Sequence, residues 1–222
     1  MADRAKIKEI FTSIQGEGPY IGVKQLFVRF CGCNLMCEYC DTNYDSKDSR
    51  IYTVDELLNE VKKNLECHSI SLTGGEPLLH AGFLKEFLPL CPLPVYLETN
   101  ATLVGELGEI IDYVDYVSAD IKLPSATHEI AYWNEHDNFI SKAAHKMIFA
   151  KVVFDENITD EEIRETVKIC AKYGVEIILQ PKSTGNQMSV NIKTSDLVMN
   201  KFLKQYKKVR LIPQMHKFLN IP

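Results

Sequence analysis

Short apolar runs alternate with amphipathic segments along most of the chain. Six of the runs predict buried strands because they are short and mostly apolar: 24–30, 69–74, 94–100, 115–122, 146–154 and 175–181. Three segments between them predict helices: 53–65, 81–90 and 159–173. The hydrophobic pattern therefore switches repeatedly between strand and helix periods.

Two of these helices carry clear starting signals. Thr53 and Thr159 can each cap a helix, and Glu56 and Glu162 follow three residues later, as in a capping box. Gly174 predicts the end of the last helix. The apolar face of the first helix is expected to consist of Val54, Leu57, Leu58, Val61 and Leu65.

Strands that alternate with helices predict βα units and a mostly parallel sheet. Six units favour a partial (β/α)6-type barrel, and a doubly wound sheet is the competing arrangement. No Gly/Ser-rich linker or internal repeat interrupts the chain, so we expect one domain over residues 1–222. In both arrangements ligands bind at the carboxyl ends of the strands, which directs attention to the segments after them: 31–40, 73–77, 98–102, 120–125 and 180–183.

Composition narrows the functional classes. The net charge of −5 argues against a nonspecific nucleic-acid binder, which normally has a basic surface. The beginning of the sequence has no apolar core of signal-peptide length, and no run approaches 18 apolar residues. We therefore expect no membrane partner and a cytoplasmic location. In that reducing compartment clustered cysteines indicate metal ligands or redox groups rather than disulfides, and the odd total of seven agrees.

The stretch "CGCNLMCEYC" holds four of the seven cysteines. Cys33, Cys37 and Cys40 have the spacing C-x3-C-x2-C, and three thiolates on one loop can bind three irons of a [4Fe–4S] cluster. A fourth iron without a thiolate would keep an open position. Cys31 lies outside this spacing at the end of a predicted strand, so we expect it to be a packing residue.

Two other uses of the triplet compete with a cluster. A structural zinc site would more often show a second C-x2-C pair downstream, and the remaining cysteines stand far apart. Buried structural thiols are common, but three at this spacing in one loop are not typical of simple packing.

The cysteine spacing after the first predicted strand resembles that of radical S-adenosylmethionine (SAM) enzymes. "LTGGEPLL" resembles the second motif of that family, and its glycines let the backbone approach a ligand closely. The resemblance implies that the open iron binds SAM, which is cleaved to a 5′-deoxyadenosyl radical, and that the protein orients the cofactor. It assigns SAM contacts to Tyr39, Cys40, Asp41, Gly75, Asp120, Ile121 and Lys122.

Within that group, "SIQGEGPYIG", "FVR", "LETN" and the final "RLIPQMHKFLNIP" resemble the 7-carboxy-7-deazaguanine synthase family. The resemblance implies radical ring contraction of 6-carboxy-5,6,7,8-tetrahydropterin with loss of ammonia, a carbon–nitrogen lyase reaction that leads to queuosine and other deazapurines. It also implies a homodimer and a reductant such as flavodoxin or ferredoxin.

The same resemblance assigns further residues. It places Ile14, Gln15, Gly16, Arg29, Thr73 and Pro222 at the substrate. Arg29 would hold the pterin carboxylate with its planar fork, although a simple strand-end ion pair is the alternative. Thr42 would ligate Mg²⁺, which takes few protein ligands. The chain departs from the family at Asp120 and Ile121, where many members have Ser-Pro, and at Ala101, where glycine is frequent.

Two other functions compete with this hypothesis. A glycyl-radical enzyme activating protein would share the cysteine loop and the glycine loop but act on a protein. A non-catalytic iron–sulfur or zinc-binding module would need no SAM loops. "SIQGEG", Arg29 and the final "IP" favour the pterin reaction.

Overall fold

The computed structural model describes residues 4–40 and 45–221. Nine strands in this part of the chain form one sheet in the order β11-β8-β7-β6-β5-β4-β2-β1-β3. Their bounds are β1 (Arg4–Ile14), β2 (Lys24–Phe30), β3 (Arg50–Thr53), β4 (Ser69–Gly74), β5 (Val95–Thr99), β6 (Tyr116–Asp120), β7 (Met147–Phe154), β8 (Glu176–Pro181) and β11 (Val209–Leu211). A separate hairpin pairs β9 (Ser183–Thr184) with β10 (Gln187–Met188).

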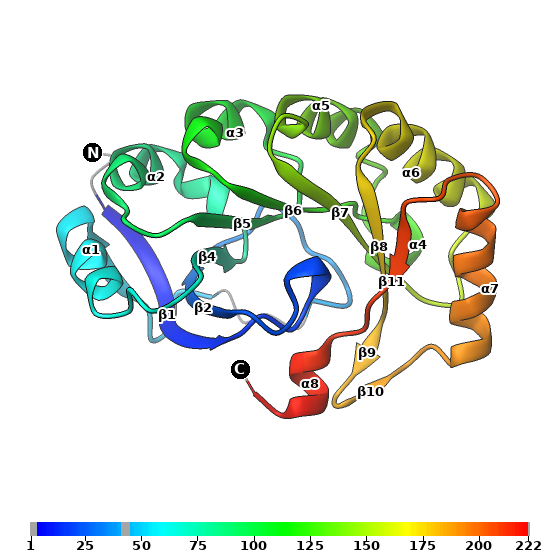
Figure 1. Ribbon diagram of the computed structural model, residues 1–222, viewed down its shortest axis with the longest axis horizontal. Coiled ribbons are helices and arrows are strands. Elements are labelled where there is room, and N and C mark those ends of the chain that lie inside the picture. The colour runs from blue at the N-terminus through cyan, green and yellow to red at the C-terminus, as the bar shows by residue number, and fades with distance from the viewer. Residues whose placement is uncertain (1–3, 41–44, 222) are drawn as a thin grey trace.

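The helices follow the strands in turn. The α-helices are α1 (Val54–Lys62), α2 (Ala81–Phe87), α3 (Val104–Ile110), α4 (Pro124–Thr127), α5 (Trp133–Ala143), α6 (Asp160–Tyr173), α7 (Ile192–Leu203) and α8 (Met215–Leu219). Short 3-10 turns are η1 (Gly18–Tyr20), η2 (Pro77–His80), η3 (Leu88–Leu90) and η4 (Ile111–Tyr113). Figure 1 shows the larger helices in an arc on the outside of the curved sheet.

The strand order decides between the two predicted arrangements. From β2 through β4, β5, β6, β7 and β8 to β11, neighbours are parallel and follow chain order without reversal. A doubly wound sheet would reverse its order at a switch point, whereas successive right-handed crossovers in one direction place every helix on one face. The fold is therefore a partial barrel, as predicted. The seventh parallel strand, β11, was not predicted.

The local predictions are confirmed at most element ends. Thr53 and Thr159 form capping boxes with Glu56 and Glu162, and Gly174 ends α6 in the left-handed conformation. One detail was wrong: α1 ends at Lys62, and Leu65 is exposed rather than part of its apolar face. The side chain of Asn64 donates to the carbonyl of Glu60 and terminates the helix before Leu65.

Five strands of the described chain (β1, β3, β9, β10 and β11) and several helices were not predicted. β1 has few apolar residues and is mostly half-buried or exposed, because it pairs antiparallel between β2 and the short edge strand β3. β3 and β11 are only 4 and 3 residues long, too short to show a period.

Successive side chains of each parallel strand point to opposite faces of the sheet. One face packs in the core under the helices, and the other is the concave face. In β7, Ala150, Val152 and Phe154 belong to the main core under the helices, whereas Phe149 belongs to a second cluster on the concave face. Lys151 and Val153 lie on the same concave side and line a cleft. On the concave face, the parallel strands therefore place apolar side chains toward their amino ends and polar side chains toward their carboxyl ends.

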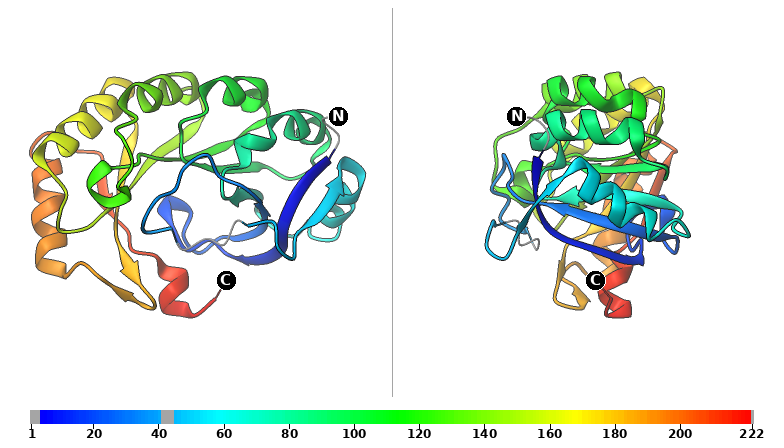
Figure 2. Two further views of the ribbon diagram at one scale, coloured as in Figure 1. Left: turned by 180° about the vertical axis from the view of Figure 1, so that it is seen from behind. Right: turned by 90° about the vertical axis from the view of Figure 1, so that its left-hand side faces the viewer.

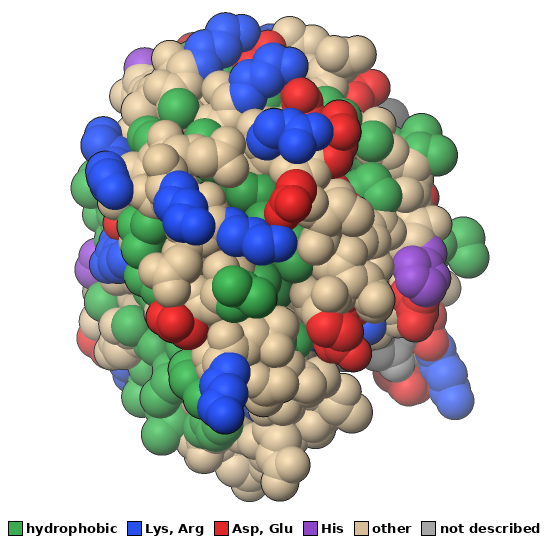
Figure 3. All heavy atoms as spheres, turned by 90° about the vertical axis from the view of Figure 1, so that its right-hand side faces the viewer, with side chains coloured by type: hydrophobic (Ala, Val, Ile, Leu, Met, Phe, Trp, Pro, Cys, Tyr) green, Lys and Arg blue, Asp and Glu red, His purple; other side chains and the backbone are tan. Residues whose placement is uncertain are grey.

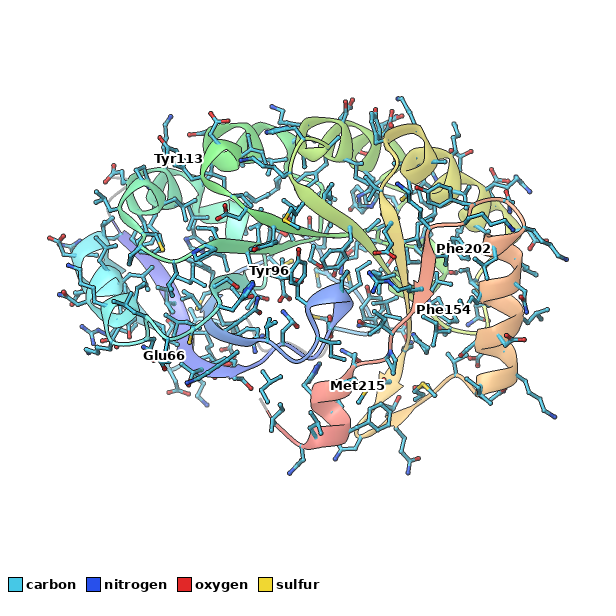
Figure 4. All side chains as sticks on the ribbon, in the orientation of Figure 1. Glu66, Tyr96, Tyr113, Phe154, Phe202 and Met215 are labelled. Atoms are coloured by element: carbon cyan, nitrogen blue, oxygen red, sulfur yellow. The ribbon has the colours of Figure 1, made fainter. Side chains whose placement is uncertain are left out.

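The turn between β1 and β2 fills the amino-end half of the concave face. Tyr20 in η1 stacks edge-on against Tyr96 (5.7 Å between ring centroids) and Tyr116 (4.7 Å). Figure 4 shows Tyr96 directed into the interior of the curved sheet. This turn closes the amino end of the barrel. It also carries residues 15–17 to the floor of the cleft.

The carboxyl-terminal part of the chain crosses the open side of the barrel. Figure 2 shows α8 and the β9–β10 hairpin there, opposite the arc of helices. On the face seen in Figure 3, acidic and basic side chains are interspersed with uncharged and apolar groups. No helix in residues 4–40 and 45–221 has the length and apolar character required to span a membrane.

Candidate active site

A cleft of about 800 Å³ lies at the carboxyl ends of the parallel strands. This is within the usual range for a site that holds small molecules. Ten residues singled out from the sequence line it: Ile14, Gln15, Gly16, Arg29, Cys33, Cys37, Tyr39, Cys40, Thr73 and Gly75. Asp120 and Lys122 do so as well. The barrel thus brings together residues that lie more than a hundred positions apart in the sequence.

Among the predicted site residues that the structure describes, Ile121 alone does not line the cleft. Ile121 is buried in the hydrophobic core, so its side chain does not face the cleft. Asp41, Thr42 and Pro222 lie outside the described residues.

The cysteine loop is tied to the glycine loop beneath it. The N–H groups of Gly75 and Glu76 donate to the carbonyls of Phe30 and Gly32, and His80 Nε2 lies 2.9 Å from the carbonyl oxygen of Cys31. Gly74 has φ +122°, and a Cβ there would lie 2.3 Å from the Phe30 carbonyl oxygen. Only glycine allows the two loops to approach this closely.

The four cysteines of the loop differ in their positions relative to the cleft. Cys31 is buried, and Cys33, Cys37 and Cys40 line the cleft. None of the seven forms a disulfide. Among the described residues no three His, Cys, Asp or Glu side chains converge on one point that would hold a single metal ion. Each thiolate of a [4Fe–4S] cluster binds its own iron, so three thiols on one loop fit a cluster.

Glu76 supports the loops from below. Its carboxylate accepts hydrogen bonds from the Leu78 and Asn100 N–H groups and from the Thr99 hydroxyl. Burial raises its pKa to about 7. Glu76 is fully buried and does not line the cleft, so its role is to join the loop after β4 to the loop after β5.

A chain of charges runs along one wall of the cleft. Asp120 pairs with Lys122 (Oδ2–Nζ 3.0 Å) and with Lys151 (Oδ1–Nζ 3.3 Å). Lys122 also donates to the Tyr39 hydroxyl (3.3 Å) and lies over its ring. Although burial alone would lower the pKa of Lys151, the carboxylates of Asp120 and Glu17 raise it well above its usual value. Sequence reasoning missed Lys151 and Glu17.

His136 joins two of the loops that form this wall. It is fully buried on α5; its Nε2 accepts from the N–H of Lys122 (3.1 Å), and its Nδ1 lies 3.3 Å from the carbonyl of Ala101. Burial lowers its pKa to about 4, so the ring is neutral at pH 7. Ala101, at the departure noted in the sequence, adopts φ +56°, a conformation usually favoured by glycine.

Three buried oxygens in the cleft have incomplete hydrogen bonding. Gln180 Oε1 and Ser183 Oγ have no hydrogen-bond partner among the described residues. Asp120 Oδ1 makes its ion pair with Lys151 but no hydrogen bond. Because buried polar groups are normally paired, these oxygens fit a polar ligand in the cleft. The cysteines, the glycine loop and these oxygens together provide a donor set that fits a cluster with SAM.

The other half of the cleft is built around Glu98 on β5. Its carboxylate accepts from Gln15 Nε2 (2.9 Å), from Ser71 Oγ (3.1 Å) and from Thr73 Oγ1 (3.4 Å). Burial raises the pKa of Glu98. Gln15 is buried and also donates to Gln25. Sequence reasoning found Gln15 and Thr73 but missed the carboxylate that holds them.

Arg29 lies at the rim of this half. Its Nε donates to Glu9 Oε1 (2.6 Å) on the neighbouring strand, and its guanidinium lies 5.6 Å from the centre of the Phe11 ring. The ion pair that was the alternative interpretation therefore exists, and Arg29 also lines the cleft. A guanidinium has further donors beyond Nε with which it can hold a carboxylate.

The carboxyl-terminal segment closes this side of the cleft. Met215 N donates to the carbonyl of Gly16 (2.9 Å), and Gln214 Nε2 donates to Glu17 Oε1 (2.8 Å). Figure 4 shows Met215 on the short helix α8 below the open side of the barrel. Asn220 and Ile221 line the cleft. Residues 220 and 221 are thus part of the cleft wall, and the substrate contact expected at Pro222 lies outside the described residues.

Comparison with known proteins identifies the family. The radical SAM superfamily matches residues 27–181. A 7-carboxy-7-deazaguanine synthase of Geobacter sulfurreducens is 35% identical, covering 97% of each chain. The chain belongs to the 7-carboxy-7-deazaguanine synthase family of radical SAM proteins.

Other members of this family agree. The 7-carboxy-7-deazaguanine synthase of Archaeoglobus fulgidus is 34% identical, covering 98% of this chain and 99% of its own. The crystal structure of QueE from Escherichia coli superposes with a TM-score of 0.66 over 96% of this chain and 95% of that one, at 19% identity. At that identity the superposition supports the fold alone, and the fold is the partial barrel described above.

Proposed function

We propose that the protein is a 7-carboxy-7-deazaguanine synthase, which converts 6-carboxy-5,6,7,8-tetrahydropterin to 7-carboxy-7-deazaguanine with loss of ammonia. The observation that carries this proposal is the shared cleft. It joins the three cysteines and Gly75 on one side to Gln15, Arg29 and Glu98 on the other. Full-length similarity to 7-carboxy-7-deazaguanine synthases favours this reaction over the activation of a protein partner.

The cofactors belong to the half of the cleft with the cysteines. Cys33, Cys37 and Cys40 would hold a [4Fe–4S] cluster, and Tyr39, Gly75, Asp120 and Lys122 would contact SAM. When bound, the cluster and SAM supply the one-electron chemistry that creates a substrate radical. Lys122 provides a cation for a carboxylate, and Asp120 provides an acceptor for a hydroxyl.

The pterin belongs to the half with Glu98. The carboxylate of Glu98 can accept hydrogen bonds from the ring N–H and amino groups of the substrate, and Thr73 and Gln15 hold that carboxylate in place. Arg29 at the rim would bind the substrate carboxylate. Closure by α8 reduces the access of water, which strengthens each of these polar interactions.

Several parts of the proposal rest on sequence resemblance. They are a Mg²⁺ ion at Thr42, a SAM contact at Asp41 and a substrate contact at Pro222. A homodimer and a flavodoxin or ferredoxin as reductant have the same basis. The cytoplasmic location is the expectation drawn from the hydrophobic pattern of the sequence. We also propose that residues 1–222 act as a single domain, which the continuous nine-stranded sheet supports.

Gly16→Ala tests the contact between α8 and the cleft. The added methyl group would lie 2.5 Å from His216 Nδ1 and 2.6 Å from its backbone nitrogen, so α8 must move. We expect the KM for the pterin to rise about tenfold, with SAM affinity unchanged. Gly105→Ala in α3 is the matched control, because a Cβ there meets no atom within 4 Å. An unchanged KM in Gly16→Ala would remove α8 from the substrate site.

The decisive assay uses the anaerobically reconstituted protein. It is incubated with SAM, dithionite, Mg²⁺ and 6-carboxy-5,6,7,8-tetrahydropterin, and products are identified by mass spectrometry. We expect 7-carboxy-7-deazaguanine and ammonia in equal amounts. A protein that contains its cluster and binds SAM but forms no product would contradict the proposed reaction. Omission of Mg²⁺ tests the second metal separately.

A further inference from the structure

The turn after α4 holds the cysteine loop directly. The N–H of Glu38 donates to the carbonyl of Thr127 (3.0 Å), and the N–H of Met36 donates to Glu129 Oε1 (2.6 Å). His128 pairs with the carboxylate of Glu38. These contacts reach both sides of Cys37, so the turn at 127–129 fixes the middle of the loop that carries the three thiols.

Glu129 is the charged member of this support. Its two oxygens are engaged separately: Oε1 accepts from Met36, and Oε2 accepts from the Tyr132 hydroxyl (3.3 Å) at the start of α5. The side chain is therefore held in place against the loop. Met36 lies between Cys33 and Cys37, and its side chain is 85% exposed, so the carboxylate meets the backbone of the loop rather than a packed side chain.

The charge of Glu129 lies close to a proposed ligand. Its carboxylate accepts from the N–H of Met36, the residue next to Cys37. A negative charge at this position opposes the addition of an electron to a cluster that Cys37 would bind. Net charge, hydrogen bonding and exposure near a cluster set its reduction potential.

We propose that Glu129 is a positioning residue that holds the cysteine loop through Met36 and lowers the reduction potential of the [4Fe–4S] cluster through its negative charge. This inference rests on the proposed cofactor. A lower potential makes the reduced cluster a stronger one-electron donor to bound SAM. The same side chain provides the hydrogen bond that holds the loop and the negative charge near the cluster. Different substitutions of Glu129 can remove the charge alone or both together.

The test compares Glu129→Gln with the wild-type protein by EPR-monitored potentiometric titration of the cluster in the absence of SAM. Glutamine keeps an acceptor oxygen for Met36 and removes the charge. We expect the equilibrium constant for one-electron reduction to increase roughly three- to tenfold, where tenfold corresponds to about 59 mV. Iron and sulfide content should stay at the wild-type level.

A matched control removes the same charge elsewhere. Glu66→Gln acts on an exposed glutamate that pairs with Lys24 at the amino end of β2, the opposite end from the cysteine loop. Figure 4 shows Glu66 at the periphery, next to α1. Its cluster should keep the wild-type potential. Glu129→Ala, which loses charge and acceptor, should share the potential of the Gln variant and release iron faster to a chelator.

The outcomes separate this inference from the proposed cofactor. An unchanged potential in Glu129→Gln, or an equal rise in Glu66→Gln, would overturn the role of Glu129 and leave the cluster assignment intact. A reconstituted wild-type protein without the iron, sulfide and EPR signal of a [4Fe–4S] cluster would contradict both.

Discussion

Replacing Cys37 with alanine is expected to abolish cluster assembly and all turnover. Cys37 is the central thiol of the triplet and lines the cleft beside Cys33 and Cys40. Two thiolates leave two irons of the cluster without protein ligands, so the cluster should not survive purification. Iron and sulfide analysis, visible absorption and EPR after reconstitution measure the loss, and product formation should fall to background. Cys33→Ala and Cys40→Ala should behave alike.

Cys31→Ala is the matched control, because the same chemical change falls two residues from Cys33. The Cys31 side chain is buried in the protein rather than in the cleft. We expect a loss of about 1 kcal/mol in unfolding free energy from reduced packing, with normal iron content. Loss of the cluster in Cys31→Ala, or its retention in Cys37→Ala, would require a different set of ligands.

The cysteine loop could be predicted from the sequence because its information is local. The spacing within residues 31–40 and the preceding strand are sufficient to place three thiols at a strand end. The six predicted strands succeeded for the same reason, since each is a short apolar run buried on both faces. Antiparallel β1 lacks such a run, and its place depends on pairing with a strand that lies ten residues later.

The polar floor of the cleft could not be predicted by the same means, although a signal was present. Lys151 interrupts an apolar strand, and Glu98 and Gln180 lie near the carboxyl ends of two others. In an isolated strand such a residue does not show which face it occupies. The barrel supplies that information: Lys151 shares the concave side with Phe149 and Val153, while the alternate residues enter the core.

Contacts between distant loops could not be predicted from the sequence. The support of Met36 by Glu129 joins residues 93 positions apart, and that of Glu17 by Gln214 joins residues 197 positions apart. No periodicity encodes such pairs, because they depend on how far each strand-end loop reaches across the barrel. The resemblance to a family places Pro222, at the end of the chain, in the site as a prediction, but it names neither Glu17 nor Gln214.

Lys151→Met is expected to destabilise the protein by about 3–5 kcal/mol at pH 7, because it leaves buried carboxylates without their cation. Lys151 pairs with Glu17 (2.5 Å) and Asp120 (3.3 Å), and its side chain is 8% exposed. Asp120 keeps Lys122, but Glu17 has no other ion-pair partner among the described residues. Urea unfolding, with circular dichroism as the probe, measures the difference.

The pH dependence of this difference has a definite sign. In the wild-type protein, burial alone would raise the pKa of Glu17, but Lys151 overcomes that effect and lowers it to about 2. Glu17 therefore contributes stability above its unfolded pKa of about 4.5, and this contribution is lost as the pH falls toward 2. In Lys151→Met, burial should dominate and raise the pKa of Glu17, so protonation of Glu17 should reduce the destabilisation of the variant. The difference in unfolding free energy between the two proteins should therefore become smaller from pH 7 to pH 4.

Lys146→Met provides the control, because it removes the same charge from a partly exposed lysine. The Lys146 ammonium donates to the carbonyl of Asp112 at the surface, so its loss should change the unfolding free energy by no more than about 0.5 kcal/mol. If Lys151→Met were no less stable than Lys146→Met, the buried pairs would not hold the cleft together. If its deficit were constant between pH 7 and pH 4, the loss would come from packing rather than from the unpaired charge of Glu17.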